Sequence, residues 1–169
     1  MVTNIYVESS SRYIREKDRV IGYVVDYTDE TGNQLKNERG EPVVRWGWGK
    51  RTGTYTGSLL IALAFAMSRA DITEEVRIHT CNKFLVGMLD TYLPGWIDRD
   101  FIRKDGEEIR YLNHWKFIGG ILKDRRYDTA YGKHTYYDWM MEEMEKVEEE
   151  RREDVCKAEQ DRDTDEAGV

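Results

Sequence analysis

The feature that most constrains the fold of this chain is a change in the period of its apolar residues near residue 55. Before that point, short runs rich in β-branched and aromatic side chains alternate with polar turns, which is typical of β-strands. After it, apolar side chains first recur every three or four residues, as on a buried helix. The predicted strands are 5–7, 19–27 and 43–48, and the first predicted helix is 56–69.

Strands and helices alternate in the second half of the chain. The predicted elements are a strand over 75–80, a helix over 83–92, a helix over 113–123, a strand over 128–131 and a helix from 135 to beyond 150. Asn82 is expected to cap the helix that follows it, and Pro94-Gly95 to stop that helix. Three strands in an antiparallel meander, followed by alternating helices and strands, predict an α/β fold with a mixed five-stranded sheet and flanking helices.

Charge divides the chain unevenly. The 169 residues carry a net charge of -7, and the segment from Glu142 to the end, with 13 acidic and 5 basic residues, accounts for a net of -8. The remaining body is nearly neutral, so the acidic pI does not exclude a nucleic-acid partner. We expect one domain over 1–147 and an acidic helix extension over 148–169. Beyond about Asp154 that extension has too few apolar residues to pack and is expected to be disordered.

Several classes of protein are not favoured. The longest apolar run, Leu59 to Met67, is shorter than the roughly 20 residues that a membrane span requires. The first residues lack the pattern of a signal peptide. Cys81 and Cys156 are far apart, which does not favour a disulfide framework or a zinc ribbon, and a reducing cytoplasm is expected.

Six segments carry a resemblance to a known family. They are Ile5-Tyr6-Val7-Glu8-Ser9-Ser10, Thr56 through Ala64, Thr80-Cys81-Asn82, Phe84 through Trp96, Asn113-His114-Trp115-Lys116 and Gly132-Lys133-His134. Together with the order of elements they resemble type I ribonuclease H over roughly residues 3–147. More distantly, the chain is similar to ribonuclease-H-like open reading frames of mobile elements in gut Firmicutes. The resemblance implies a ribonuclease-H-like sheet with its usual flanking helices.

The resemblance also implies where catalysis would occur. In that family four carboxylates hold two Mg²⁺ ions, which activate water and stabilise the leaving oxygen. The corresponding positions here are Glu8, Ser58, Cys81 and Asp138 (or Glu142). Serine is a weak neutral ligand, and a thiol is badly matched to magnesium. We therefore expect a degenerate site without two-metal catalysis and predict no metal ion and no cofactor.

Each of these residues also has an explanation that needs no ion. Glu8 at a strand end can be a solvated or hydrogen-bonded carboxylate, and Ser58 fits the chemistry of a helix start. Asp138 follows Thr135 by three residues and fits a capping box. His134 corresponds to the product-release histidine of the family, or else is a loop residue.

Cys81 invites one more interpretation. With His79, His114 or His134 as a base, its thiol could act as a nucleophile. A small buried cysteine at the end of a strand is the commoner case. We expect the second.

Three functions remain open. The favoured one is a non-catalytic module that binds RNA, an RNA–DNA hybrid or a nucleoprotein through the former substrate face. The residues expected to meet nucleic acid are Arg12, Arg15, Lys17, Arg45, Trp46, Trp48, Lys50 and Arg51. The second is a protein-interaction module or an inhibitor of a host enzyme, whose acidic tail docks on a basic protein partner. The third is a divergent metal-dependent nuclease that uses Glu8, Asp138 and Glu142.

Overall fold

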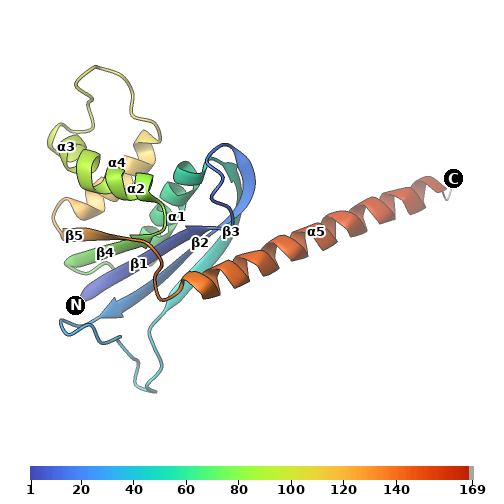
Figure 1. Cartoon of the computed structure of the whole chain (residues 1–169), viewed down its shortest axis with the longest axis horizontal. Coiled ribbons are helices and arrows are strands. Elements are labelled where there is room, and N and C mark those ends of the chain that lie inside the picture. Colours follow the sequence, from blue (N-terminus) through green and yellow to red (C-terminus); the bar gives the residue numbers. More distant parts are fainter. Residues whose placement is uncertain (168–169) are drawn as a thin grey trace.

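A five-stranded mixed sheet forms the centre of the protein. The computed structural model describes the backbone of residues 1–167, and the side chains of residues 1–150 and 152–162. The strands are β1 (Val2–Ser9), β2 (Lys17–Thr28), β3 (Arg45–Gly53), β4 (Glu75–Thr80) and β5 (Arg126–Tyr131). They lie in the order β3-β2-β1-β4-β5 (Figure 1). The predicted α/β fold class is confirmed.

Strand pairing follows the predicted meander. β1 pairs antiparallel with β2, and β2 pairs antiparallel with β3. β1 pairs parallel with β4, and β4 pairs parallel with β5. The carboxyl ends of β1, β4 and β5 therefore meet at one edge of the sheet, where polar side chains can converge.

One face of the sheet is covered by helices that follow β3 and β4. These are α1 (Tyr55–Arg69), α2 (Lys83–Gly87), the π-helix η1 (Met88–Tyr92), α3 (Leu93–Asp98) and α4 (Leu112–Leu122). Thr54 caps α1 by accepting a hydrogen bond from the Gly57 N–H, and most of the side chains of α1 are buried. Asn82 caps α2 as predicted, accepting from the N–H groups of Phe84 and Leu85. This layer and the sheet enclose the main hydrophobic core.

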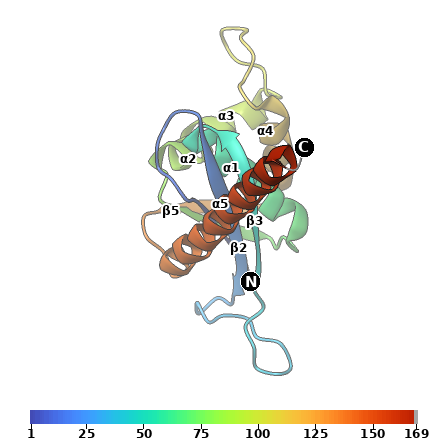
Figure 2. The same cartoon turned by 90° about the vertical axis from the view of Figure 1, so that its right-hand side faces the viewer.

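The last helix, α5 (Tyr137–Ala167), packs on the opposite face. Its first turns contribute Met140 and Met144 to a second, smaller core with Tyr6, Val20 and Val24. The helix then runs past the edge of the sheet and projects away from the domain (Figures 1 and 2). From residue 149 on, every side chain that the structure describes is exposed.

Several boundaries differ from the sequence prediction: β1, β2 and β5 are longer than expected, and β3, expected over 43–48, spans Arg45–Gly53. Pro94 does not stop the helical segment: a π-helical turn precedes it, and Pro94 then occupies the first turn of α3, where its missing N–H costs no hydrogen bond. α5 begins at Tyr137, two residues after Thr135, and continues as a helix through Ala167, where disorder was expected beyond Asp154. Residues 168–169, also predicted to be disordered, lie outside the described residues, and the division at 147/148 stays a prediction. None of the described helices is long and apolar enough to cross a membrane.

Candidate functional site at the ends of β1 and β4

Glu8, Cys81 and His134 come together where β1 and β4 end. They are three of the five residues that the resemblance places at a catalytic site, the others being Ser58 and Asp138. Glu8 is the penultimate residue of β1, Cys81 follows β4, and His134 lies in the loop between β5 and α5. The N-terminus of α1 is joined to this edge by hydrogen bonds between the side chains of Thr56 and Asn82. Parallel pairing of β1 with β4 sets this arrangement, because it brings the carboxyl ends of both strands to one edge.

Glu8 is a fully buried carboxylate with two hydrogen-bond donors. Its side chain is 0% exposed, and Oε1 accepts from the backbone N–H of Cys81 at 2.8 Å. The same oxygen lies 3.1 Å from Nε2 of His134, whose side chain is 4% exposed. A buried carboxylate is stabilised by such pairing. Glu8 is therefore a hydrogen-bonded carboxylate and not a solvated one, and His134 is its side-chain partner.

Aromatic rings enclose His134. The centre of the Tyr6 ring, on β1, lies 4.9 Å from the centre of the His134 ring. The centre of the Tyr137 ring, on α5, lies 6.1 Å from it. Tyr6 also stacks on His79 at 4.3 Å, with an interplanar angle of 19°. Burial lowers the pKa of His79 to about 4, so that this imidazole is neutral at physiological pH. His134 thus lies in the loop between β5 and α5, as one of the two alternatives expected, and its side chain is buried.

The thiol of Cys81 is protected from ionisation. Burial, together with the negative charge of Glu8, raises the pKa of Cys81 to about 11. The thiolate is the nucleophilic form of cysteine, and at neutral pH it is a very small fraction of this residue. His114, one of the bases considered above, lies on α4 beside Tyr111, in the layer of helices that covers one face of the sheet. The structure does not favour a cysteine nucleophile at this position.

The remaining degenerate positions, Ser58 and Asp138, do not complete a metal site. Asp138 lies in the first turn of α5, is exposed, and pairs with Lys133 at 3.2 Å. Ser58 is fully buried in the first turn of α1. Of the side chains that the structure describes, no three His, Cys, Asp or Glu residues are placed to hold a metal ion. The donor set of one carboxylate, a hydroxyl and a protonated thiol does not fit a pair of magnesium ions.

Both partners of the Glu8–His134 pair have a buried polar atom without a hydrogen-bond partner. Within the described part of the chain these unpaired atoms are Glu8 Oε2, His134 Nδ1, Ser58 Oγ, the Tyr55 hydroxyl, Arg51 Nε and Trp115 Nε1. The charge of Glu8 contributes, after burial, to raising the pKa of Tyr55, so these two groups are close. Unpaired buried polar groups destabilise a fold and tend to persist where function requires them.

A buried arginine organises the loop before β2. Arg19 is 1% exposed, and its guanidinium donates to the carbonyl oxygens of Gly53, Ser11, Tyr13 and Arg15 at 2.7–3.0 Å. The loop of residues 10–16 is therefore folded around this side chain. The sequence analysis missed this role, because a basic residue beside other basic residues looks solvent-exposed. An arginine at the start of an apolar strand was the available signal.

The basic residues predicted to bind nucleic acid lie at two opposite ends of the sheet. Arg12, Arg15 and Lys17 are exposed at the end of the sheet where Glu8 lies. Lys17 pairs with Gly53, so the Lys50-Arg51 end of β3 is at the same end. Arg45 begins β3 and lies about 25 Å along the strand from Gly53, at roughly 3.3 Å per residue. It pairs there with Asp71 at 3.3 Å, away from the others.

The two predicted tryptophans pack against α5. Trp46 and Trp48 lie 5.7 and 5.5 Å from the Trp139 ring, and Trp48 covers Gly22 so closely that a Cβ there would clash at 2.3 Å. These contacts with Trp139 are packing interactions. Trp46 remains 53% exposed. Behind β3, on the α1 side, a groove of about 590 Å³ has Lys50 and Arg51 at its rim.

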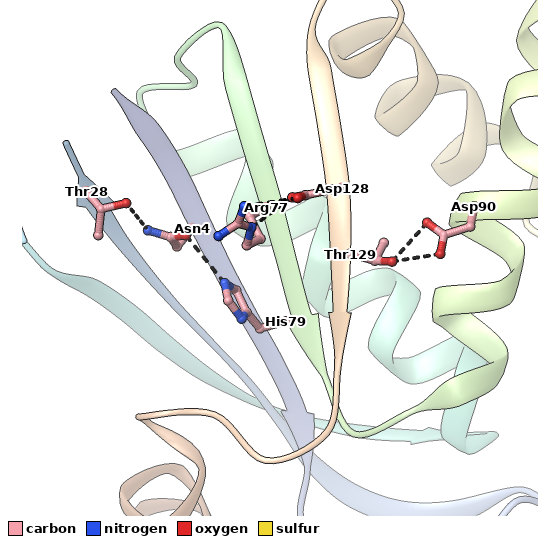
Figure 3. A network of polar contacts seen from close by, with 7 residues as sticks. All are labelled: Asn4, Thr28, Arg77, His79, Asp90, Asp128 and Thr129. Carbon is pink, nitrogen blue, oxygen red and sulfur yellow. Dashed lines mark hydrogen bonds and ion pairs between the residues drawn. The ribbon is translucent and has the colours of Figure 1, made fainter. Parts of the chain in front are cut away.

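A polar face lies beside α5 on β1, β4 and β5 (Figure 3). Asn4 donates to Thr28 and contacts His79, and Arg77 binds Asp128 through two hydrogen bonds of 2.9 and 3.0 Å. These interactions satisfy the side chains among themselves. The polar face is therefore an ordered part of the sheet surface.

Comparisons with known proteins place the fold. Neither a protein-family model nor a curated protein matches this sequence. Among solved structures, a foamy viral protease-reverse transcriptase in complex with dsDNA is similar with a TM-score of 0.57 and 17% identity, over 85% of this chain and 89% of that one. The fold is ribonuclease-H-like.

Two further structures agree. LC9-RNase H1, a type 1 RNase H with the type 2 active-site motif, has a TM-score of 0.54 and 18% identity over 86% of this chain and 69% of its own. The RNase H domain of PFV has a TM-score of 0.51 and 15% identity over 80% of this chain and 79% of its own. The fold expected from the resemblance is confirmed, and identities this low extend no further than the fold.

Proposed function

We propose that this chain binds nucleic acid at the end of the sheet where β1 and β4 finish, without two-metal cleavage. The observation that carries the proposal is the state of Glu8, which is buried and hydrogen-bonded to His134 and Cys81. Oε2 of Glu8 is left without a partner, but the neutral Ser58 and Cys81 add no further carboxylate with which it could hold a pair of magnesium ions. The basic loop of residues 10–17 lies beside this edge and can meet phosphates.

The fold is consistent with such a ligand. Foamy viral protease-reverse transcriptases, which share this fold at 17% and 14% identity, have been solved with dsDNA and with an RNA/DNA hybrid. Binding could thus be retained where cleavage is lost. The chain would then be a divergent, non-catalytic member of the ribonuclease-H-like proteins, and an origin in a mobile element is part of the same proposal.

The test is a binding and cleavage experiment on the full chain. Fluorescence anisotropy with an RNA–DNA hybrid, dsRNA and single-stranded DNA should show association at 50 mM NaCl that weakens steeply with salt. Incubation of the hybrid with Mg²⁺ or Mn²⁺ should give no cleavage. Absence of association with all three probes at low salt would remove the proposal. Cleavage that disappears in Glu8→Ala would instead establish the divergent nuclease.

A second function is carried by α5. Its acidic residues beyond Val147 project from the domain with their described side chains exposed (Figure 1). Such a helix offers a negative surface to a basic protein partner or mimics nucleic acid. A chain ending at Val147 should then lose the partner while keeping the fold.

A further inference from the structure

Two exposed cations flank one tyrosine ring at the mouth of the Glu8 site. The guanidinium carbon of Arg12 lies 5.4 Å from the centre of the Tyr137 ring, and Nζ of Lys133 lies 5.0 Å from it. Arg12 also donates a 2.7 Å hydrogen bond to the Tyr137 hydroxyl. The ring therefore holds both cations near one another, although they come from loops 121 positions apart in the sequence.

The same cations lie close to the degenerate metal positions. Arg12 and Lys133 each oppose the burial that raises the pKa of Cys81, so both act on its thiol electrostatically. The backbone N–H of Cys81 binds Glu8, and Lys133 directly precedes His134, the other partner of Glu8. Arg12 and Lys133 therefore lie near Cys81, one of the positions where the resemblance would put metal ligands.

Two cations balance the two carboxylates that remain at these positions. In type I ribonuclease H, four carboxylates need divalent cations before a phosphate can approach. Here two of those positions are the neutral Ser58 and Cys81, and Glu8 is buried against His134. The exposed charged groups beside them are the guanidinium of Arg12 and the ammonium of Lys133, the two kinds of group that proteins use to bind phosphate, and the carboxylate of Asp138.

We propose that Arg12 and Lys133 bind a backbone phosphate of the nucleic acid in place of metal ions, so that binding needs no divalent cation. The identity of the ligand rests on the proposed function. Tyr137 acts as a positioning residue, since it fixes Arg12 through its hydroxyl and both cations through its ring. The planar guanidinium of Arg12 can donate directed hydrogen bonds to a phosphate, and the ammonium group of Lys133 attracts the phosphate as a point charge.

One anionic side chain faces the pair from α5. Asp138 binds Lys133 at 3.2 Å, and both side chains are largely exposed, at 83% and 66%. A phosphate must compete with this carboxylate for the ammonium group. Asp138→Asn should consequently raise the affinity for phosphate, while Lys133→Ala lowers it.

The experiment has two arms on the full chain. In the first, inorganic phosphate is titrated in 1 mM EDTA and followed by NMR, with the Arg12 Nε–H and the amides of Cys81 and Lys133 as reporters. In the second, anisotropy with labelled single-stranded DNA is measured in EDTA and in Mg²⁺ at equal ionic strength. Variants Arg12→Ala and Lys133→Ala are compared with Lys36→Ala and Arg39→Ala, two exposed cations at the opposite end of the sheet.

The expected result is saturable phosphate shifts at Arg12 and Lys133, and DNA binding that persists in EDTA. Each site variant should weaken DNA binding about 5- to 20-fold and reduce the slope of log K against log salt by about 1, while the control variants leave the slope near that of the wild type. Lys133→Arg should retain most of the affinity, and Asp138→Asn should increase it.

The outcomes separate the two proposals. DNA binding that disappears in EDTA, or that Arg12→Ala and Lys133→Ala leave unchanged, overturns the phosphate site and leaves the proposed function standing. Phosphate shifts without any DNA binding overturn the proposed function and keep the phosphate site. An absence of both overturns the two together.

Discussion

Replacing Arg19 with methionine should destabilise the domain and weaken ligand binding, although Arg19 touches no ligand. The guanidinium is 1% exposed and makes four hydrogen bonds of 2.7–3.0 Å to backbone carbonyls, three of them in the loop of residues 10–16. Each hydrogen bond from a charged donor contributes about 1.5–3 kcal/mol, and these are not additive. The loop carbonyls can regain water once the loop moves, which offsets part of the loss.

We therefore expect a loss of about 3–4 kcal/mol in the free energy of unfolding, out of about 5–15 kcal/mol for a domain of this kind. The melting temperature should fall by roughly 10 °C. Urea denaturation followed by tryptophan fluorescence measures the first, and calorimetry the second. Because the network is buried, the loss should change little between 0.05 and 0.5 M NaCl.

Two variants make this prediction specific. Arg15→Met removes an exposed side chain from the same loop and should change stability by less than about 0.5 kcal/mol. Arg19→Lys keeps the charge but cannot satisfy four carbonyls, so it should lie near the methionine variant. A loss below about 1 kcal/mol for Arg19→Met, with DNA affinity unchanged, would refute the view that this side chain holds the loop that carries Arg12.

Three further predictions follow from the site and from α5. Cys81 should react with iodoacetamide far more slowly than the exposed Cys156 at pH 8 and gain reactivity only towards pH 11, as mass spectrometry of labelled peptides can show; equal rates would contradict its raised pKa. Because the pKa of His79 is lowered to about 4 from 6.5, its neutral form contributes stability that is complete above pH 6.5 and is lost as the pH falls towards 4. Urea midpoints of the wild type and His79→Asn should diverge less at pH 4.5 than at pH 7, and a constant difference would argue against this assignment. A chain ending at Val147 loses a net charge of -6 and should bind single-stranded DNA several-fold more tightly than the full chain at 50 mM NaCl, and as tightly as the full chain at 0.5 M. An unchanged affinity at 50 mM NaCl would show that the end of α5 does not repel DNA.

Much of the fold could be predicted from local sequence. The alternating strand segments and the apolar helix after Thr54 depend on side-chain periodicity, which the sequence shows directly. Asn82 was identified as a helix cap because its side chain bonds the next N–H groups, a strictly local interaction. The β4 strand, Glu75–Thr80, has the predicted bounds.

Errors arose where longer-range packing decides. Pro94 reads as a helix stop, yet a π-turn lets the chain continue because Leu89, Leu93 and Trp96 are all buried in the core. The sequence gives no sign of this accommodation. The end of α5 is a related case, since its predicted disorder rested on the absence of apolar residues, and the structure has a helix there whose described side chains are exposed.

For the site, the sequence by itself determined which chemical groups stand at the positions singled out by the resemblance, and only the tertiary structure decided which side chains lie beside them. Ser58 and Cys81 are poor magnesium ligands wherever they lie, because hardness and charge belong to the side chain itself. Glu8 pairs with His134, which is 126 positions away in the sequence, and Arg12 and Lys133 both contact the Tyr137 ring. These contacts depend on how distant segments of the chain meet. No periodicity encodes such contacts, since they are fixed by the parallel register of β1 with β4 and by the path of the chain into α5.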